Sequence, residues 1–271
     1  DDKDTQCLQD LRQTDPRDDK KRIEDTKGGL LQDAYNWVLD NSEFQQWRNS
    51  TDRHLLWIKG DPGKGKTMLL CGIVNELQSL SPETGLLSFF FCQGTDTRIN
   101  NATAILRGLI YLLLDQQPSL IPHVRKKYDH AGKKLFEDEN GWVALSEIFT
   151  NILQDPSLES AYLVIDALDE CKVDLPKLLK FIVVSSTFPR VKWIISSRNW
   201  PNITESLEAA EQKIRLSLEL NKESISSAVR TYVQHKVDGL TKLKKYDEET
   251  QHSIQHSLSL NANDTFLWVA L

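Results

Sequence analysis

The segment with the most specific chemistry runs from residue 60 to residue 67 and has the sequence GDPGKGKT. It satisfies the GxxxxGK[ST] pattern of a phosphate-binding loop and lies between a short apolar run and a helical pattern, as that loop requires. Its glycines can adopt backbone angles closed to other residues, so successive amide N–H groups can converge on one anion. Lys66 would place its charge on the β and γ phosphates, and Thr67 would offer a hydroxyl to Mg²⁺. The residues of this segment expected to bind a nucleotide are Gly60, Asp61, Pro62, Gly63, Lys64, Gly65, Lys66, Thr67 and Met68.

A nucleotide site also needs carboxylates, one for the magnesium shell and usually another to orient the attacking water. The apolar run 162–165 ends in Asp166, which would hold Mg²⁺ together with Thr67. Asp169 and Glu170 follow within one turn, where a carboxylate can polarise water or sense the third phosphate. Of these two acids, Glu170 is favoured as the base.

A cation follows the next apolar run, residues 191–196, in the form of Arg198. If that strand lies beside the strand of the phosphate loop, Arg198 points toward the γ phosphate. A cation there stabilises charge and reports whether the phosphate is present. The catalytic residues expected from these patterns are Lys66, Asp166, Asp169, Glu170 and Arg198, and the expected metal ligands are Thr67 and Asp166.

Short apolar runs alternate with longer helical patterns after residue 52, which is typical of a parallel sheet covered by helices on both faces. The expected strands are residues 54–59, 86–92, 162–166, 191–196 and 213–218. The expected helices between them are residues 66–79, 102–116, 142–153, 175–186 and 203–210. This alternation and the loop together predict an α/β fold of the P-loop NTPase kind, with a parallel five-stranded sheet.

The two ends of the chain differ from this core. Charge dominates residues 1–27, which predicts an exposed arm with little structure. A helical pattern follows at 30–39, a second short segment carries Phe44 and Trp47, and two more helical patterns follow Lys222. The predicted parts are a charged linker with a helical segment over 1–50, the P-loop core over 51–220 and a helical segment over 221–271.

Composition argues against several classes of protein. The chain has 271 residues, 39% of them hydrophobic, so it can bury a core without a disulfide or a metal. Its net charge of −6 argues against a nucleic-acid partner, which needs a basic face. The longest apolar runs are far too short for a membrane span. Four dispersed cysteines without a CxxC pair are expected to be buried thiols in the reducing cytoplasm.

Taken in order, the motifs resemble the NACHT nucleotide-binding domain of fungal NOD-like receptors, which belongs to the STAND class of P-loop NTPases. The resemblance covers nearly the whole chain. Two motifs precede the sheet, DPRDDK at 15–20 and TKGGLL at 26–31, and the phosphate loop follows them. The later motifs are SFFFC at 88–92, LDEC at 168–171, SSR at 196–198 and TFLWV at 265–269.

This resemblance implies a strand order of 2-3-1-4-5, with the strands of Asp166 and Arg198 on either side of the phosphate-loop strand. It implies that segment 22–29, including Arg22 and Ile23, wraps the base and ribose of ATP, ADP, GTP or GDP bound with Mg²⁺. Domains of this class are switches, closed with a diphosphate and open and oligomeric with a triphosphate. In fungi they control non-self recognition and programmed cell death, through an effector domain and a set of repeats that are both expected outside this chain.

The sequence leaves more than one function open. The leading hypothesis is a nucleotide switch that hydrolyses slowly and self-associates. A small-molecule kinase would need a mobile basic lid, for which the segment after Ser119, with Arg125, Lys126 and Lys127, is the candidate. A scaffold that holds nucleotide without hydrolysing it is the third possibility, and the complete set of site residues argues against it. The sequence does not decide between adenine and guanine.

Overall fold

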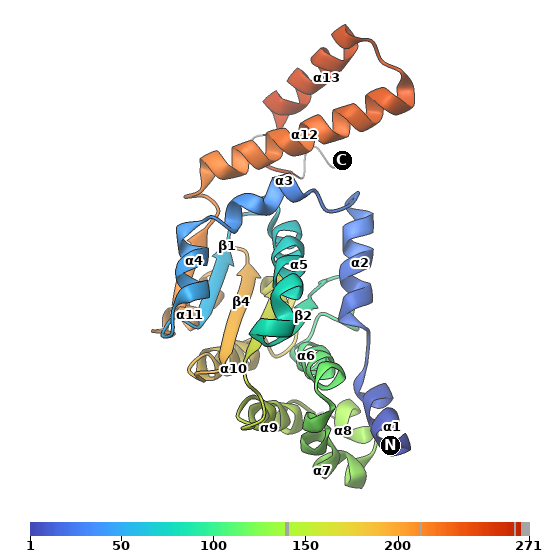
Figure 1. Ribbon diagram of the computed structural model, residues 1–271, viewed down its shortest axis with the longest axis vertical. Helices are drawn as coiled ribbons and strands as arrows, with labels where there is room; N and C mark the ends of the chain where they lie inside the picture. The colour runs from blue at the N-terminus through green and yellow to red at the C-terminus, as the bar shows by residue number, and fades with distance from the viewer. Residues whose placement is uncertain (139–140, 212, 263, 267–271) are drawn as a thin grey trace.

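A sheet of five parallel strands forms the centre of the computed structural model, which describes residues 1–138, 141–211, 213–262 and 264–266 (Figure 1). The strands are β1 (Leu55–Lys59), β2 (Leu86–Phe91), β3 (Ala161–Asp166), β4 (Val191–Ser197) and β5 (Lys213–Ser217). Each begins and ends within one residue of its expected bounds. The predicted α/β fold with a parallel five-stranded sheet is therefore confirmed.

The strand order is β2-β3-β4-β1-β5. The expected order 2-3-1-4-5 is therefore wrong in the positions of β1 and β4, which are interchanged. β4 occupies the central position, where Ile195 lies opposite both Ile165 of β3 and Trp57 of β1. The sequence could not settle this point because β1 and β4 are both apolar and buried along most of their length. As a result, β4 separates the strand of Asp166 from the strand of the phosphate loop.

Right-handed crossovers assign the helices to the two faces of this sheet. The step from β1 to β2 runs one way along the sheet and puts α5 (Lys66–Thr84) on one face. The steps from β2 to β3, β3 to β4 and β4 to β5 run the other way, so their helices cover the opposite face (Figure 1). Those helices are α6 (Ala102–Gln116), α9 (Gly141–Leu153), α10 (Leu175–Ser185) and α11 (Pro201–Glu208).

One helix cannot cover one face of five strands, and N-terminal segments complete the face that carries α5. They are α2 (Pro16–Thr26), α3 (Gln32–Tyr35), the 3₁₀ turn η1 (Asn36–Val38) and α4 (Ser42–Asn49). Lys20 of α2 donates to Asn75 Oδ1 of α5 at 2.6 Å, and Tyr35 packs against Gly72 of α5. Phe44 and Trp47 of α4 are fully buried beside β1 and β5.

The charged N-terminal residues are helical and packed, which corrects the expectation of an exposed arm. The first of these helices, α1 (Asp2–Leu11), begins with a capping box and buries Cys7 and Leu11 completely. Arg107 of α6 donates to the carbonyls of Leu11 at 2.9 Å and Asp10 at 2.8 Å, which satisfies the end of α1. The few apolar residues of this segment are enough to dock it because they share one helix face.

The remaining elements lie at the two ends of the sheet. Two helical patterns after Lys222 are confirmed as α12 (Lys222–Lys244) and α13 (Glu248–Asn261), which pack side by side beyond the α3 end (Figure 1). Helices that the sequence analysis did not anticipate lie at the opposite end: η2 (Pro118–Leu120), α7 (Ile121–Ala131) and α8 (Lys134–Glu137). Of the TFLWV motif, residues 267–269 lie outside the described part of the chain. Within that part, no helix is long and apolar enough to cross a membrane.

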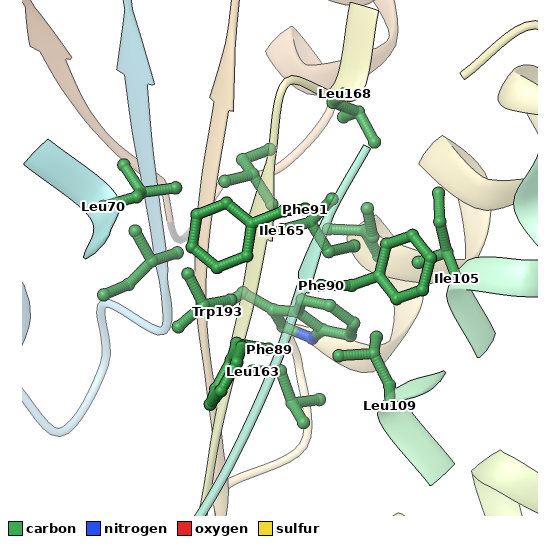
Figure 2. Packing of buried hydrophobic residues seen from close by; sticks show 14 of the residues in the cluster. Leu70, Phe89, Phe90, Phe91, Ile105, Leu109, Leu163, Ile165, Leu168 and Trp193 are labelled. Carbon is green, nitrogen blue, oxygen red and sulfur yellow. The ribbon is translucent and has the colours of Figure 1, made fainter. Parts of the chain in front are cut away.

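Aromatic residues of β2 join the two halves of the core (Figure 2). Phe90 points to the α6 face, where it meets Ile105 and Leu109, while Phe89 and Phe91 lie together on the other face. This alternation follows from the two-residue period of a strand. All four cysteines are free and buried, as the sequence predicts.

Candidate nucleotide-binding site

The phosphate loop connects the end of β1 to the start of α5. Gly63 and Gly65 have positive φ values of 80° and 81°, a conformation that glycine adopts without strain. Lys66 at the start of α5 turns back over the loop, where its Nζ donates to the Gly60 carbonyl and, at 3.0 Å, to the Asp61 carbonyl. Burial lowers the pKa of Lys66, and the nearby Asp169 and Asp166 carboxylates oppose that shift. The loop therefore holds a half-buried cation at its centre.

The carboxylate of Asp166 lies at the carboxyl end of β3 and is 1% exposed. Ser196 of β4 donates to its Oδ1 at 2.6 Å, and the Thr67 hydroxyl also hydrogen-bonds to this carboxylate. Burial raises the pKa of Asp166, and these hydrogen bonds and the charge of Lys66 act in the opposite direction. Asp166 thus faces Thr67 although β4 separates their strands.

The two downstream acids occupy different positions. They belong to the 3₁₀ turn η3 (Leu168–Glu170), which follows Ala167 in a left-handed conformation. Asp169 is 5% exposed. It accepts a hydrogen bond from the Arg198 amide at 2.9 Å and forms an ion pair with Arg198 Nε at 3.1 Å. Glu170 lies 3.9 Å from Arg198 and accepts the Gly94 amide at 2.7 Å. Asp169 therefore fixes Arg198, whereas Glu170 keeps one oxygen less engaged.

These groups converge on one pocket of about 320 Å³. Most of the residues expected from the sequence line it, namely Pro62, Gly63, Lys64, Gly65, Lys66, Thr67, Met68, Asp166, Asp169, Glu170 and Arg198. Gly60 and Asp61, the first two residues of the loop, are not among the residues that line the pocket. Gly60 packs against Leu218, and the Asp61 amide donates to Glu219 at 2.6 Å. Their carbonyls support Lys66 and do not face the cavity.

Arg22 and Ile23, expected to contact the base and ribose, are not among the residues that line this pocket. Ile23 is buried in the core, and Arg22 donates to Asp19 at 3.0 Å and to Gln93 at 3.1 Å. Because α2 continues to Thr26 and packs beside the edge strand β2, Ile23 points into the core while Arg22 stays exposed. The end of the same segment reaches the pocket through Lys27 and Gly29.

Sequence reasoning missed the apolar wall of the pocket. It consists of side chains from the residues just before α3, from α3, η1, α12 and the C-terminal segment, namely Leu30, Leu31, Ala34, Tyr35, Trp37, Ile225, Tyr232 and Phe266. Phe266 donates its amide to the Gly63 carbonyl at 2.8 Å, and its ring packs on Gly65 and, edge to face, on Tyr232. Apolar residues at the ends of the chain carry no signal for this role, because helical spacing predicts ordinary core packing equally well.

Thr67 and Asp166 suit a magnesium ion. Both residues line the pocket, and a hydroxyl with a carboxylate is a hard donor set of the kind that Mg²⁺ shares with phosphate oxygens. The apolar wall and the glycine loop line the same cavity. An anion and a flat ring can therefore be accommodated together.

The fold and the loop define an α/β protein of the P-loop NTPase kind. The chain belongs to the family described as nephrocystin 3, N-terminal, whose model matches residues 33–198. It is 64% identical over 270 residues to the vegetative incompatibility protein HET-E-1 of Podospora anserina. The match covers 99% of this chain and 20% of that protein, so the chain spans about a fifth of the relative's length.

Proposed function

We propose that this chain is a magnesium-dependent nucleotide switch, the NACHT domain of a fungal NOD-like receptor of the STAND class. It binds ATP and ADP or GTP and GDP, hydrolyses the triphosphate slowly, and opens and self-associates in the triphosphate state. In the whole protein this change would control signalling in non-self recognition and programmed cell death. Flanking effector and repeat domains would receive and supply that signal.

The observation that carries this proposal is the convergence of Lys66, Thr67 and Asp166 in one pocket with an apolar wall. Lys66 can exchange its present partners, the carbonyls of Gly60 and Asp61, for phosphate oxygens, because both carbonyls belong to the phosphate loop itself. Arg198, held by Asp169, supplies a second cation at the edge of the pocket. The similarity to a vegetative incompatibility protein supports the biological role.

Three features support a switch over a metabolite kinase. The residues considered for a kinase lid lie on α7, at the end of the molecule opposite α12 (Figure 1). Arg125 pairs there with Asp4 at 2.6 Å, and Lys127 pairs with Glu147 at 2.6 Å. The pocket is instead bordered by α12 and by residue Phe266, elements that follow the core in the chain.

The test is identification of the nucleotide that copurifies with the chain when magnesium is retained, followed by thermal unfolding with ADP and with GDP. We expect one base to dominate and to raise the unfolding temperature of the wild type. Lys66→Ala should abolish that rise because it removes the positive charge that attracts the phosphate oxygens. Lys21→Ala, which changes an exposed lysine of α2, is the matched control and should keep it. An equal rise in Lys66→Ala would contradict the assignment of the site.

A scaffold that binds nucleotide without hydrolysing it is distinguished from the switch by measuring nucleotide hydrolysis. Inorganic phosphate release from ATP and GTP should be slow but above background in the wild type, and absent in Lys66→Ala. Binding without any release of phosphate would favour the scaffold.

A further inference from the structure

We infer that Ser196 is a positioning residue for magnesium, one that fixes the Asp166 carboxylate and the turn that follows it. The inference rests on the proposed function, because it assigns a role toward the metal that accompanies the nucleotide. Its basis is a pair of hydrogen bonds made by one buried hydroxyl between β3 and β4.

Ser196 occupies the position of β4 next to the end of β3. Ile195 pairs with Ile165 in the parallel register, so the following residues, Ser196 and Asp166, lie side by side near the carboxyl ends of their strands. Ser196 is fully buried and still lines the pocket. The next residue, Ser197, points to the other face, where its Oγ accepts the indole N–H of Trp57 at 2.9 Å. Only the first of these two serines faces the site.

The direction of each hydrogen bond is fixed by chemistry. The Ala167 amide can only donate, and it donates to Ser196 Oγ at 2.9 Å. The hydroxyl proton of Ser196 is therefore left for Asp166 Oδ1, which it reaches at 2.6 Å. That bond engages Oδ1 and fixes the orientation of the carboxylate, while Oδ2 receives no hydrogen bond from Ser196. The arrangement suits an ionised carboxylate whose orientation must not vary.

The same hydroxyl anchors a strained turn. Ala167 has φ 52° and ψ 50°, a left-handed conformation that is unfavourable for a residue with a side chain. The hydrogen bond from the Ala167 amide to Ser196 Oγ holds that conformation. The turn η3, which carries Asp169 and Glu170, begins at the next residue. One side chain thus links the orientation of the metal carboxylate to the placement of the two downstream acids.

Magnesium demands near-ideal octahedral geometry, so a carboxylate that can rotate is a poorer ligand than one held in place. Outer hydrogen-bond partners of metal ligands typically account for about 10- to 100-fold in metal affinity. Ser196→Ala should therefore raise the Mg²⁺ concentration needed for nucleotide binding by about 10- to 100-fold. Nucleotide binding in EDTA should not change, because the glycine loop and Lys66 do not depend on Ser196.

The experiment titrates Mg²⁺ into the 271-residue chain with ADP, and in a parallel series with GDP, and follows binding by calorimetry. Ser196→Thr keeps the hydroxyl and should restore the wild-type Mg²⁺ requirement. Ser196→Cys keeps the size with a weaker donor and carries the test if the alanine variant does not fold. Ser185→Ala is the matched control, since Ser185 is a buried serine of α10 that accepts the Trp193 indole at 3.1 Å away from the pocket.

The outcomes separate the inference from the function it rests on. A wild type that binds neither nucleotide with Mg²⁺ would overturn the proposed function and this inference together. A wild type that binds, with a folded Ser196→Ala or Ser196→Cys that keeps the same Mg²⁺ requirement, would overturn the inference alone. An equal loss of binding with Mg²⁺ and in EDTA would also overturn it, because a merely structural role predicts that result.

Discussion

Asp166 is a carboxylate in a place where ionisation is costly. Burial raises its pKa above the ordinary value of 3.8, so the folded chain loses stability as pH rises through that raised pKa. Asp166→Asn removes the charge and keeps an acceptor for Ser196. We therefore expect the nucleotide-free variant to melt about 2–4 °C above wild type at pH 7, which corresponds to about 1 kcal/mol in a chain of this size.

That gain should disappear as pH falls, because protonated Asp166 no longer bears a charge. Thermal unfolding of both proteins between pH 4 and pH 7, without nucleotide, measures it. The same variant should lose the additional stabilisation that Mg²⁺ gives in the presence of ADP or GDP. A variant less stable than wild type at pH 7 would show that the charge of Lys66 outweighs the cost of burial.

Asp169 and Glu170 are adjacent in sequence but differ in what they contact. Glu170→Gln should reduce phosphate release strongly while nucleotide affinity stays near that of wild type, because Glu170 is the proposed base. Asp169→Asn should instead weaken both, since Arg198 loses the partner that holds its guanidinium at 3.1 Å. Steady-state phosphate release together with calorimetric affinities measures the difference. Identical profiles for the two variants would contradict separate roles.

At the scale of elements, the docking of α1 depends on one buried cation. Arg107 is 8% exposed, and burial lowers its pKa, yet its guanidinium reaches two carbonyls at the end of α1. The carbonyl end of a helix carries partial negative charge, so it suits a cation. Arg107→Met should lower the free energy of unfolding by about 2 kcal/mol, the usual contribution of hydrogen bonds to a charged group.

Urea unfolding measures that loss, and hydrogen exchange of residues 2–11 should locate it. Arg98→Met, which changes an exposed arginine, is the control and should have almost no effect. If α1 exchanged at the wild-type rate in Arg107→Met, its other contacts, among them buried Cys7 and Leu11 and the ion pair of Asp4 with Arg125, would suffice to hold the helix.

The helices and strands of the core were largely predictable from the sequence, but which elements pack beside one another was not. All five strands could be located within one residue because apolar runs between turn signals leave few alternatives. The order of β1 and β4 in the sheet could not be predicted, because both strands are apolar and strand pairing is a long-range contact that local sequence does not specify. The burial of α1 and α2 was missed for a related reason, because charge dominates the sequence there. The buried residues of the two helices are few and two of them are charged: Cys7, Leu11, Pro16, Asp19, Lys20 and Ile23.

The site shows the same limit. Lys66, Thr67, Asp166 and Arg198 could be found because chemistry requires those residue types at fixed places in a P-loop fold. Ser196 could in principle have been noticed as a polar residue within an otherwise apolar strand. The apolar wall could not, because Phe266 lies 200 residues from the loop residue Lys66 and nothing local relates the two.

At the scale of the whole molecule, the phosphate loop is fastened to the far end of the chain. Lys64 Nζ donates to the Asp264 carbonyl at 3.0 Å, and the Phe266 amide donates to Gly63. Asp264 in turn accepts the Ser226 hydroxyl of α12 at 2.5 Å. Hydrogen bonds therefore connect the loop that would contact phosphate to α12 through the C-terminal segment, and α12 packs on α13. A change of the loop on nucleotide binding has a direct mechanical route to the helices beyond the sheet.

This route predicts that nucleotide protects α12 as well as the loop. In the wild type, ADP or GDP with Mg²⁺ should slow amide hydrogen exchange both in residues 60–67 and in the start of α12, since Ile225, Tyr232 and Phe266 border the same pocket. Phe266→Ala should keep the protection of the loop and lose most of the protection in α12, because the ring that bridges Gly65 and Tyr232 is gone. Leu260→Ala, which truncates an exposed residue of α13, is the matched control and should preserve both. Protection of α12 that survives in Phe266→Ala would mean that the helix contacts the nucleotide by itself, without the C-terminal segment as intermediary.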